Sequence, residues 1–194
     1  MKDQQNILAG EIKMAVREIT YEERDKMYDH TLKVMGITRK RPSREELETE
    51  IIDYLSNNKI CSLATCGKDG WPRISVVNYM NDGLVIYIFS EGVDKFKNLR
   101  ENNRVAVGIG TGSKAANTRG INIWGIAEVF DAEADEFDHG MKIFGPVLDD
   151  MQKAAGGTIT IPKEILRLVR ITPARMVYQH TAQGIKHAVW ESDC

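Results

Sequence analysis

The spacing of hydrophobic and polar positions divides the chain into a helical beginning and a strand-rich remainder. Apolar residues recur every three or four positions over 20–35 and again over 43–57, which is the period of an amphipathic helix. Each run opens with a Ser or Thr followed three residues later by Glu, the spacing of a capping box. We therefore expect residues 1–57 to form an N-terminal arm and helices, and 58–194 to form a separate β domain.

Beyond residue 58 the apolar runs become short and are bounded by turn residues, which is typical of β-strands. The runs are 60–66, 73–80, 84–90, 104–111, 121–130, 166–181 and 185–192. Short turn sequences separate the first three runs, so they predict a three-stranded antiparallel meander. Helices are expected over 94–101 and, after a cap at Asp131, in two pieces broken at Gly145–Pro146. Pro173 predicts a bend or bulge at a sheet edge.

About seven antiparallel strands with few helices predict a mainly β fold with flanking helices. An open sheet would leave unpaired edges that need protection, so a small antiparallel barrel is the better prediction.

Composition excludes several classes of function. The 194 residues are 42% hydrophobic with a formal net charge of −2, so no basic surface predicts nucleic-acid binding. No apolar run reaches the roughly 18–20 residues of a membrane span, and the N-terminus has no signal-peptide core, so we expect a cytoplasmic protein. The three cysteines and four histidines have no metal-ligand spacing, and no metal site is predicted.

The stretch E-G-V-D-K-F-K-N-L-R at 91–100 places two lysines, Lys95 and Lys97, in the first turns of a predicted helix. The free N–H groups of a helix N-terminus already carry roughly half a positive charge. Asp94 supplies the one carboxylate of this turn. The lysines therefore either point into solvent or bind an anion from outside the chain.

Several short motifs follow one another in a recognisable order. They are D-G-x-P (Asp69, Gly70, Pro72), K-x-x-N-L (Lys95, Asn98, Leu99), a V-A-V strand (105–107) and G-x-A-E (Gly125, Ala127, Glu128). Together they resemble the pyridoxamine 5′-phosphate oxidase-like family of flavin-binding split barrels. The resemblance implies a split antiparallel β-barrel over 58–194, in a homodimer that binds FMN between its subunits.

The resemblance also implies a set of cofactor-binding residues. Lys95 matches the family's phosphate-binding lysine, and residues 75–78 match the strand that runs alongside the flavin ring and its ribityl chain. The full set is Arg73, Ser75, Val76, Val77, Asn78, Phe89, Ser90, Lys95, Lys97 and Trp190. Some alternatives stay open, because Ser75 and Asn78 face opposite sides of an ideal strand, and Val76, Val77 and Trp190 also suit a hydrophobic core.

The implied function is an FMN-dependent oxidoreductase that transfers hydride through flavin N5 to or from a small molecule. Val93, Asp94 and Phe89 replace residues that help to bind phosphate in the family's oxidases. The C-terminal segment also lacks their substrate-binding arginines, so pyridoxamine phosphate oxidation itself is not expected. No acid–base constellation identifies a catalytic residue.

Two alternatives remain at this stage. The same barrel could hold haem or a deazaflavin, with His180 or His187 as the candidate haem ligands. It could also be a non-catalytic dimeric binding protein that has lost its cofactor site.

Overall fold

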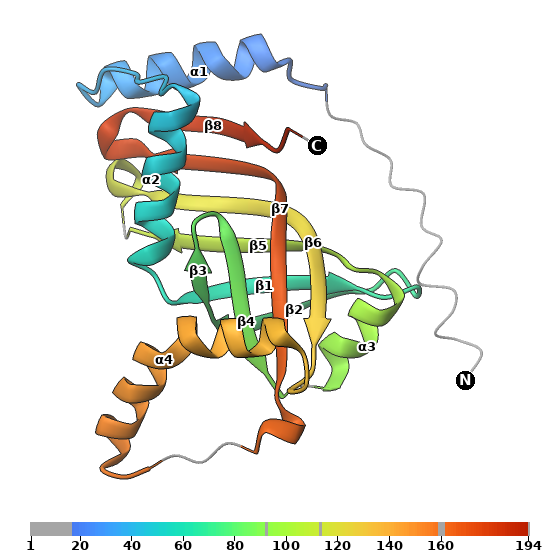
Figure 1. The fold of residues 1–194 in the computed structure, drawn as a ribbon. Helices are drawn as coiled ribbons and strands as arrows, with labels where there is room; N and C mark the ends of the chain where they lie inside the picture. Colours follow the sequence, from blue (N-terminus) through green and yellow to red (C-terminus); the bar gives the residue numbers. More distant parts are fainter. Residues whose placement is uncertain (1–16, 92, 113, 159–161, 194) are drawn as a thin grey trace.

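The computed structural model describes residues 17–91, 93–112, 114–158 and 162–193 (Figure 1). The N-terminal arm predicted from the sequence lies outside the described residues as far as residue 16. The helices are α1 (Tyr21–Val34), α2 (Arg44–Ser56), α3 (Val93–Glu101) and α4 (Asp135–Ala155). The strands are β1 (Ile60–Cys66), β2 (Pro72–Asn78), β3 (Met80–Asp82), β4 (Val85–Ser90), β5 (Arg104–Thr111), β6 (Arg119–Phe130), β7 (Arg167–His180) and β8 (Ile185–Glu191).

The first two helices begin at the predicted capping boxes. The side chain of Thr20 accepts a hydrogen bond from the backbone N–H of Glu23, and Ser43 does the same for Glu46. The two helices differ in their packing. Leu32 is the one buried residue along α1, whereas α2 buries Leu47, Ile51, Tyr54 and Leu55 in the main core. We infer that α2 is part of the barrel's hydrophobic core and that α1 rests on its surface.

Within the described residues, eight antiparallel strands form one sheet in the order β2-β1-β5-β6-β7-β4-β3, with β8 also paired to β7. The predicted meander is wrong, because the run 73–80 breaks at Tyr79. The side chain of Tyr79 is fully buried, and its hydroxyl donates to the carbonyl of Leu55 at 2.9 Å. Strands β2 and β3 therefore lie at opposite ends of the strand order, although they follow one another in the chain. The fold is a split antiparallel β-barrel with flanking helices, as predicted.

Pro173 lies at a bulge, as predicted, although β7 is not an edge strand. The register of the β6–β7 pairing shifts between Trp124 and Gly125, so that one extra residue of β7 faces β6 at this point. On its other side β7 pairs with β4 as far as Ile171 and with β8 from Arg175 onward. Pro173 falls between these two partners, where a missing N–H leaves no ladder bond unmade.

The prediction of two helical pieces broken at Gly145–Pro146 is wrong. α4 is a single helix that contains Pro146 and changes direction along its length (Figure 1). It starts at Asp135 after Ala134 rather than at Asp131, whose carboxylate accepts from the backbone of Glu133 in a turn. A proline in a helix interior favours a kink over a complete break when packing supports both sides.

Hydrophobic side chains form two cores on the two faces of β4. Ile86 and Ile88 point into the barrel and join the main cluster beneath α2. Tyr87 and Phe89 point the other way and pack against Phe137 and other residues of α4. This alternation fixes the direction of every residue along β4, including Ser90 at its end.

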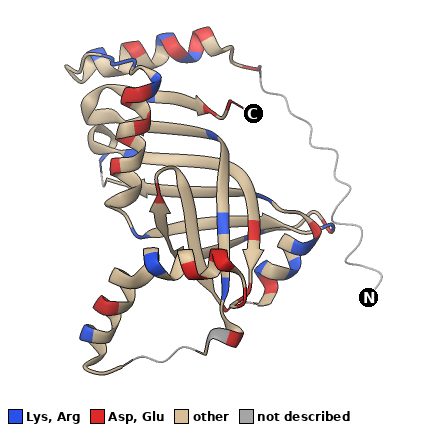
Figure 2. Cartoon of the chain, in the orientation of Figure 1, with Lys and Arg blue, Asp and Glu red and all other residues tan. Residues whose placement is uncertain are grey.

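The outer face of the remaining strands carries two rows of cross-strand neighbours. One row is Ile74, Ala64, Ala106, Trp124 and Arg175, and the other is Val76, Ser62, Gly108, Asn122, Val177 and Val189. Ile74 and Val76 are 69% and 72% exposed, and Trp124 is 43% exposed. Figure 2 shows that charges gather mainly on the helices and that the central strands carry few. This face therefore exposes several large apolar side chains to solvent.

Candidate cofactor site

The candidate site is the junction between β4 and α3. Ser90 follows Ile86 and Ile88 on the inward side of β4, and it is 4% exposed. Helix α3 begins three residues later and buries Lys95, Phe96 and Leu99. Its Asn98 donates to the hydroxyl of Thr65 at 3.1 Å, which fixes the helix against β1.

Lys95 and Lys97 occupy different environments. Lys95 is 9% exposed, and its ammonium donates to the hydroxyl of Ser90. Burial lowers the pKa of Lys95, and the negative charge of Glu91 opposes that shift. Lys97 is exposed. The two lysines therefore differ in solvation. Lys97 is solvated, whereas Lys95 is a partly desolvated cation at the start of a helix.

Arg73 connects β2 to the same helix. Its guanidinium donates to the carboxylate of Asp94 at 3.0 Å, and both side chains are about half exposed or more. The predicted anion partner Arg73 is therefore already paired with a carboxylate of the chain.

The remaining predicted residues of β2 divide between its two faces. Ser75 and Val77 are half-buried and lie opposite Leu63 and Cys61, on the barrel side of the sheet. Val76 and Asn78 are exposed on the other side. Among the described strands, β2 pairs only with β1, so the backbone groups along its other edge have no partner strand.

Phe89 lies next to Ser90 in the chain but points away from it. Its ring makes edge-to-face contacts with Phe137 and Phe144, with centroid distances of 5.1 and 4.8 Å. The structure therefore places Phe89 in the core beneath α4, and the prediction that it contacts a cofactor has no support from its surroundings.

Trp190 is also distant from Ser90 within one chain. Ser90 pairs with Arg167 at the start of β7, whereas Trp190 pairs with Met176. Nine residues of strand separate those partners, roughly 30 Å if fully extended. The indole N–H of Trp190 donates to Glu48 of α2 at 2.6 Å. Within one chain Trp190 packs against α2 rather than beside Lys95.

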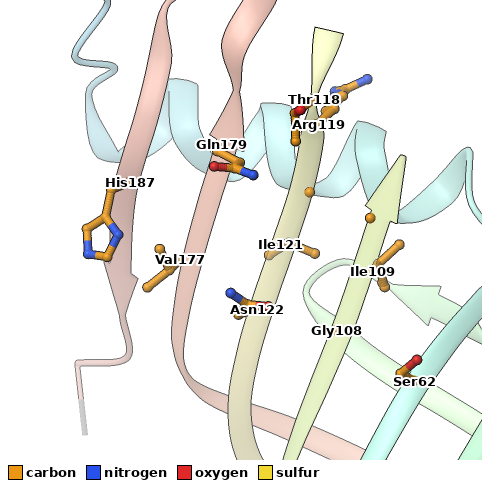
Figure 3. A pocket seen from close by; sticks show the side chains of 12 residues that line it. Ser62, Gly108, Ile109, Thr118, Arg119, Ile121, Asn122, Val177, Gln179 and His187 are labelled. Atoms are coloured by element: carbon orange, nitrogen blue, oxygen red, sulfur yellow. The ribbon is translucent and has the colours of Figure 1, made fainter. Parts of the chain in front are cut away.

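The structure also contains a hollow of about 400 Å³ on the outer face of the sheet, which was not predicted from the sequence. Ser62, Asn122, Val177, Gln179 and His187 line it from β1, β6, β7 and β8 (Figure 3). Small residues such as Gly108 leave the space open. A polar Asn122 inside the apolar run I-N-I-W was the one signal of it in the sequence.

Of the two histidines proposed as haem ligands, His187 is engaged in a hydrogen bond, whereas the buried Nδ1 of His180 has no hydrogen-bond partner among the described residues. Nε2 of His187 lies 2.9 Å from a guanidinium nitrogen of Arg24, which can only donate. His180 has its Nδ1 3.8 Å from Glu50. Burial lowers the pKa of both histidines. His187 also has a φ of 52°, in the left-handed region that few non-glycine residues adopt.

The chemistry of the β4–α3 junction fits the phosphate end of a flavin nucleotide. A buried ammonium, a hydroxyl and the start of a helix together favour an anion. Phe89 and Trp190 do not belong to this donor set, whereas Ser90 and Lys95 do. The fit therefore rests on the side chains of Ser90 and Lys95 and on the free edge of β2.

Other kinds of site find less support. In the part of the chain that the structure describes, no group of three or more His, Cys, Asp or Glu side chains is placed to hold a metal ion. None of the described helices is long and apolar enough to span a membrane.

Comparisons with known proteins agree with the geometry of the fold. A conserved hypothetical protein from Mycobacterium tuberculosis aligns with a TM-score of 0.56 and 21% identity, over 80% of this chain and 98% of that chain. An FAD-binding protein from Mesorhizobium loti gives a TM-score of 0.52 and 21% identity, over 66% and 90%. HutZ, the haem storage protein of Vibrio cholerae, gives 0.54 and 15%, over 71% and 98%. These likenesses show the shared fold.

The sequence itself matches a family. None of the curated proteins matches the chain. Residues 47–178, which are more than half of the chain, match the family model of pyridoxamine 5′-phosphate oxidase. That range contains β1 through most of β7 together with Ser90, Lys95 and the free edge of β2. The chain therefore belongs to the pyridoxamine 5′-phosphate oxidase family of split barrels.

Proposed function

We propose that this protein binds FMN with the phosphate at Ser90 and Lys95, and that it acts as an oxidoreductase on a small molecule. The observation that carries the proposal is the buried ammonium of Lys95 beside the Ser90 hydroxyl at the start of α3. A desolvated cation is costly unless an anion offsets it. Among the described contacts of Lys95, its hydrogen bond goes to a neutral hydroxyl, and the charge of Glu91 does not fully offset the effect of burial on its pKa.

When bound, FMN supplies hydride transfer at N5 of its ring. The chain's own residues then have three tasks. Lys95 neutralises phosphate charge, and Ser90 holds a hydrogen bond beside it. The unpaired edge of β2 offers backbone donors and acceptors next to Ser75 and Val77, where a flat ring with several carbonyl and nitrogen atoms can be held.

We further propose a homodimer formed through the outer face of the sheet. Ile74, Val76 and Trp124 expose large apolar side chains on this face, and exposed apolar surface commonly marks an interaction site. A second copy is the partner that the family resemblance implies, with the cofactor site at the subunit interface. Trp190 is not part of this face, because its side chain is buried in the main core and donates to Glu48 of α2.

Two other functions receive less support. Haem ligation through His187 is disfavoured because Arg24 occupies its Nε2. Pyridoxamine phosphate oxidation is disfavoured because the segment from Gly184 to Asp193 contains no arginine to hold a substrate phosphate. The proposal therefore leaves the substrate as a small molecule of another kind.

Equilibrium titration with FMN and with riboflavin, which lacks the phosphate, tests the proposal. We expect FMN to bind more tightly than riboflavin to the unchanged protein. Lys95→Met should weaken FMN at least about tenfold, the usual scale of a charge-assisted hydrogen bond to phosphate, and leave riboflavin unchanged. Lys97→Met is the matched control and should alter neither. Equal losses of both ligands, or no loss of FMN, would show that Lys95 does not hold the phosphate.

A further inference from the structure

Another hollow, of about 430 Å³, lies where α3 meets the end of β6 and the start of β7. Val93, Phe96 and Arg100 line it from α3, spaced three and four residues apart on one face of the helix. Asp94 and Asn98 are on a different face, where they contact β2 and β1. The hollow is therefore separate from the contacts that hold α3 against those two strands.

Much of the lining of this hollow is apolar and yet open to solvent. Val93 is 77% exposed, Ile165 is 56% exposed and Val129 is 41% exposed. Exposed apolar side chains gathered around one concavity commonly mark a binding site. An apolar group that entered the hollow would remove this surface from water, which favours binding.

Two arginines at the hollow have no carboxylate partner among the described residues. Arg167 is half-buried, and Nη1 of its guanidinium donates to the backbone carbonyls of Glu164 and Leu166 at 2.8 and 2.7 Å. Arg100 is exposed in the last turn of α3. Glu91 is the one acidic residue among the described lining residues. The lining therefore has an excess of one positive charge.

Two further charges are close to the hollow along the chain, and they have opposite signs. Lys95 follows Val93 by two residues, and Glu164 precedes Ile165. Neither of them lines the hollow, and together they leave the balance of charge as it is. The excess of one positive charge therefore holds for the lining and for its immediate surroundings.

The backbone holds the guanidinium of Arg167 in place before any ligand binds. Both of its described hydrogen bonds come from one nitrogen, so the other N–H groups of the planar fork remain for an acceptor from outside the chain. A guanidinium that is already oriented loses less conformational entropy on binding. Its geometry matches that of a carboxylate.

We propose that this hollow is a binding site for an organic acid with one carboxylate and an apolar body. Arg167 binds the carboxylate, Arg100 adds positive charge at the rim, and the exposed apolar side chains contact the body. One carboxylate matches the single excess positive charge of the lining. The proposal does not depend on FMN, because Ser90 and Lys95 do not line the hollow.

Three probes separate the two parts of the proposed ligand. Phenylbutyrate has both parts, phenylbutanol has the same apolar body without the charge, and acetate has the carboxylate alone. Dissociation constants are measured by NMR titration of the full chain, following the backbone amides of the residues that line the hollow. The binding variants are Arg167→Gln, which removes the charge, and Ile165→Ser, which removes part of the apolar wall.

Arg104→Gln is the matched control. Arg104 is also an exposed arginine without a carboxylate partner among the described residues. It pairs with Ile126, which is three residues from Val129 in β6 and therefore on the opposite face of the sheet. Arg100→Gln, at an exposed position of α3, provides a second charge variant that is independent of the folding of Arg167→Gln.

In the unchanged protein and in Arg104→Gln, phenylbutyrate should bind at least about threefold more tightly than phenylbutanol, the upper scale of a partly exposed charge pair. Acetate should bind more weakly than either. Arg167→Gln should weaken phenylbutyrate alone, Arg100→Gln should do so by a smaller factor, and Ile165→Ser should weaken both phenyl compounds alike. Unshifted amides at the hollow, equal losses of acid and alcohol in both charge variants, or an equal loss in Arg104→Gln would overturn the proposal.

Discussion

At the scale of single residues, Lys95 has the properties of a binding residue rather than of a structural one. Its ammonium is partly desolvated, which lowers its pKa, and its described hydrogen bond is to one hydroxyl. Residues that serve function commonly reduce stability in this way. The stability of a Lys95 variant therefore distinguishes the two roles.

Lys95→Met keeps an unbranched side chain that is one heavy atom shorter and removes the charge. We expect the free energy of unfolding in urea to rise or to stay within about 1 kcal/mol of the unchanged protein, since no charge is then desolvated. Lys97→Met, at an exposed position, should change it by less than about 0.5 kcal/mol. A loss of more than about 2 kcal/mol in Lys95→Met would mean that the lysine holds the fold together.

Residue-scale predictions from the sequence succeeded where they depended on local pattern. The motif K-x-x-N-L placed Lys95 and Asn98 on one short helix, and the structure has both there. The direction of Phe89 was also available from alternation, which sends Ser90 and Phe89 to opposite faces of β4. The pairing of Arg73 with Asp94 was not, because it joins residues that are 21 positions apart through the packing of β2 against α3.

At the scale of elements, α1 rests on β8 through few contacts. Leu32 is its one described buried residue, and Arg24 donates to Nε2 of His187. That hydrogen bond requires neutral His187, because a protonated ring has no acceptor. Charged groups around His187 are Arg24, Arg175 and Arg39, which oppose its protonation, and Asp25, which favours it. Acid should therefore loosen the attachment of α1.

Burial and the neighbouring arginines lower the pKa of His187 below its usual 6.5 in the folded state. The unfolded chain then binds more protons in the window just below pH 6.5, so the free energy of unfolding falls as pH drops through that window. Hydrogen exchange of the α1 amides at pH values above and below the window measures the effect locally. His187→Asn should reduce the dependence, because Asn tolerates the left-handed conformation and keeps an acceptor. Equal protection of α1 on both sides of the window would refute the attachment through His187.

The elements differ in how well the sequence predicted them, and the reason is the range of the forces involved. The capping boxes of α1 and α2 act over three residues and were identified correctly. The break between β2 and β3 depends on Tyr79, whose hydroxyl reaches Leu55 of α2. The continuity of α4 through Pro146 is supported by packing on both sides of the proline, where Phe144 and Val147 belong to the same hydrophobic cluster. Both are tertiary effects that periodicity does not record.

At the scale of the whole molecule, the outer face of the sheet is the surface on which the proposed dimer depends. Val76→Lys would place a charge among the exposed apolar side chains at the β2 end of this face, where burial against a second copy is unfavourable. We expect the variant to be monomeric by light scattering at concentrations where the unchanged protein is dimeric.

The control is Val34→Lys on α1, where the valine is 73% exposed, close to the 72% of Val76. That variant should stay dimeric, because α1 is not part of the outer face. Dimers in both variants would exclude this face as the interface.

The overall architecture was largely predictable, because the alternating runs and turn residues indicate a small antiparallel barrel and the family resemblance carried by the motifs implies that it is a split barrel. The hollow lined by Asn122 and His187 was not, because it forms only when five strands place small and polar residues side by side.

The central claim is that the barrel holds a flavin nucleotide, and the visible absorption spectrum of the freshly purified protein tests it most directly. The spectrum is repeated after FMN has been added and the excess removed. The account predicts the two broad bands of a bound flavin, present at purification or retained after the addition. A single sharp and intense band, which indicates haem, or a colourless protein that does not retain FMN would contradict it.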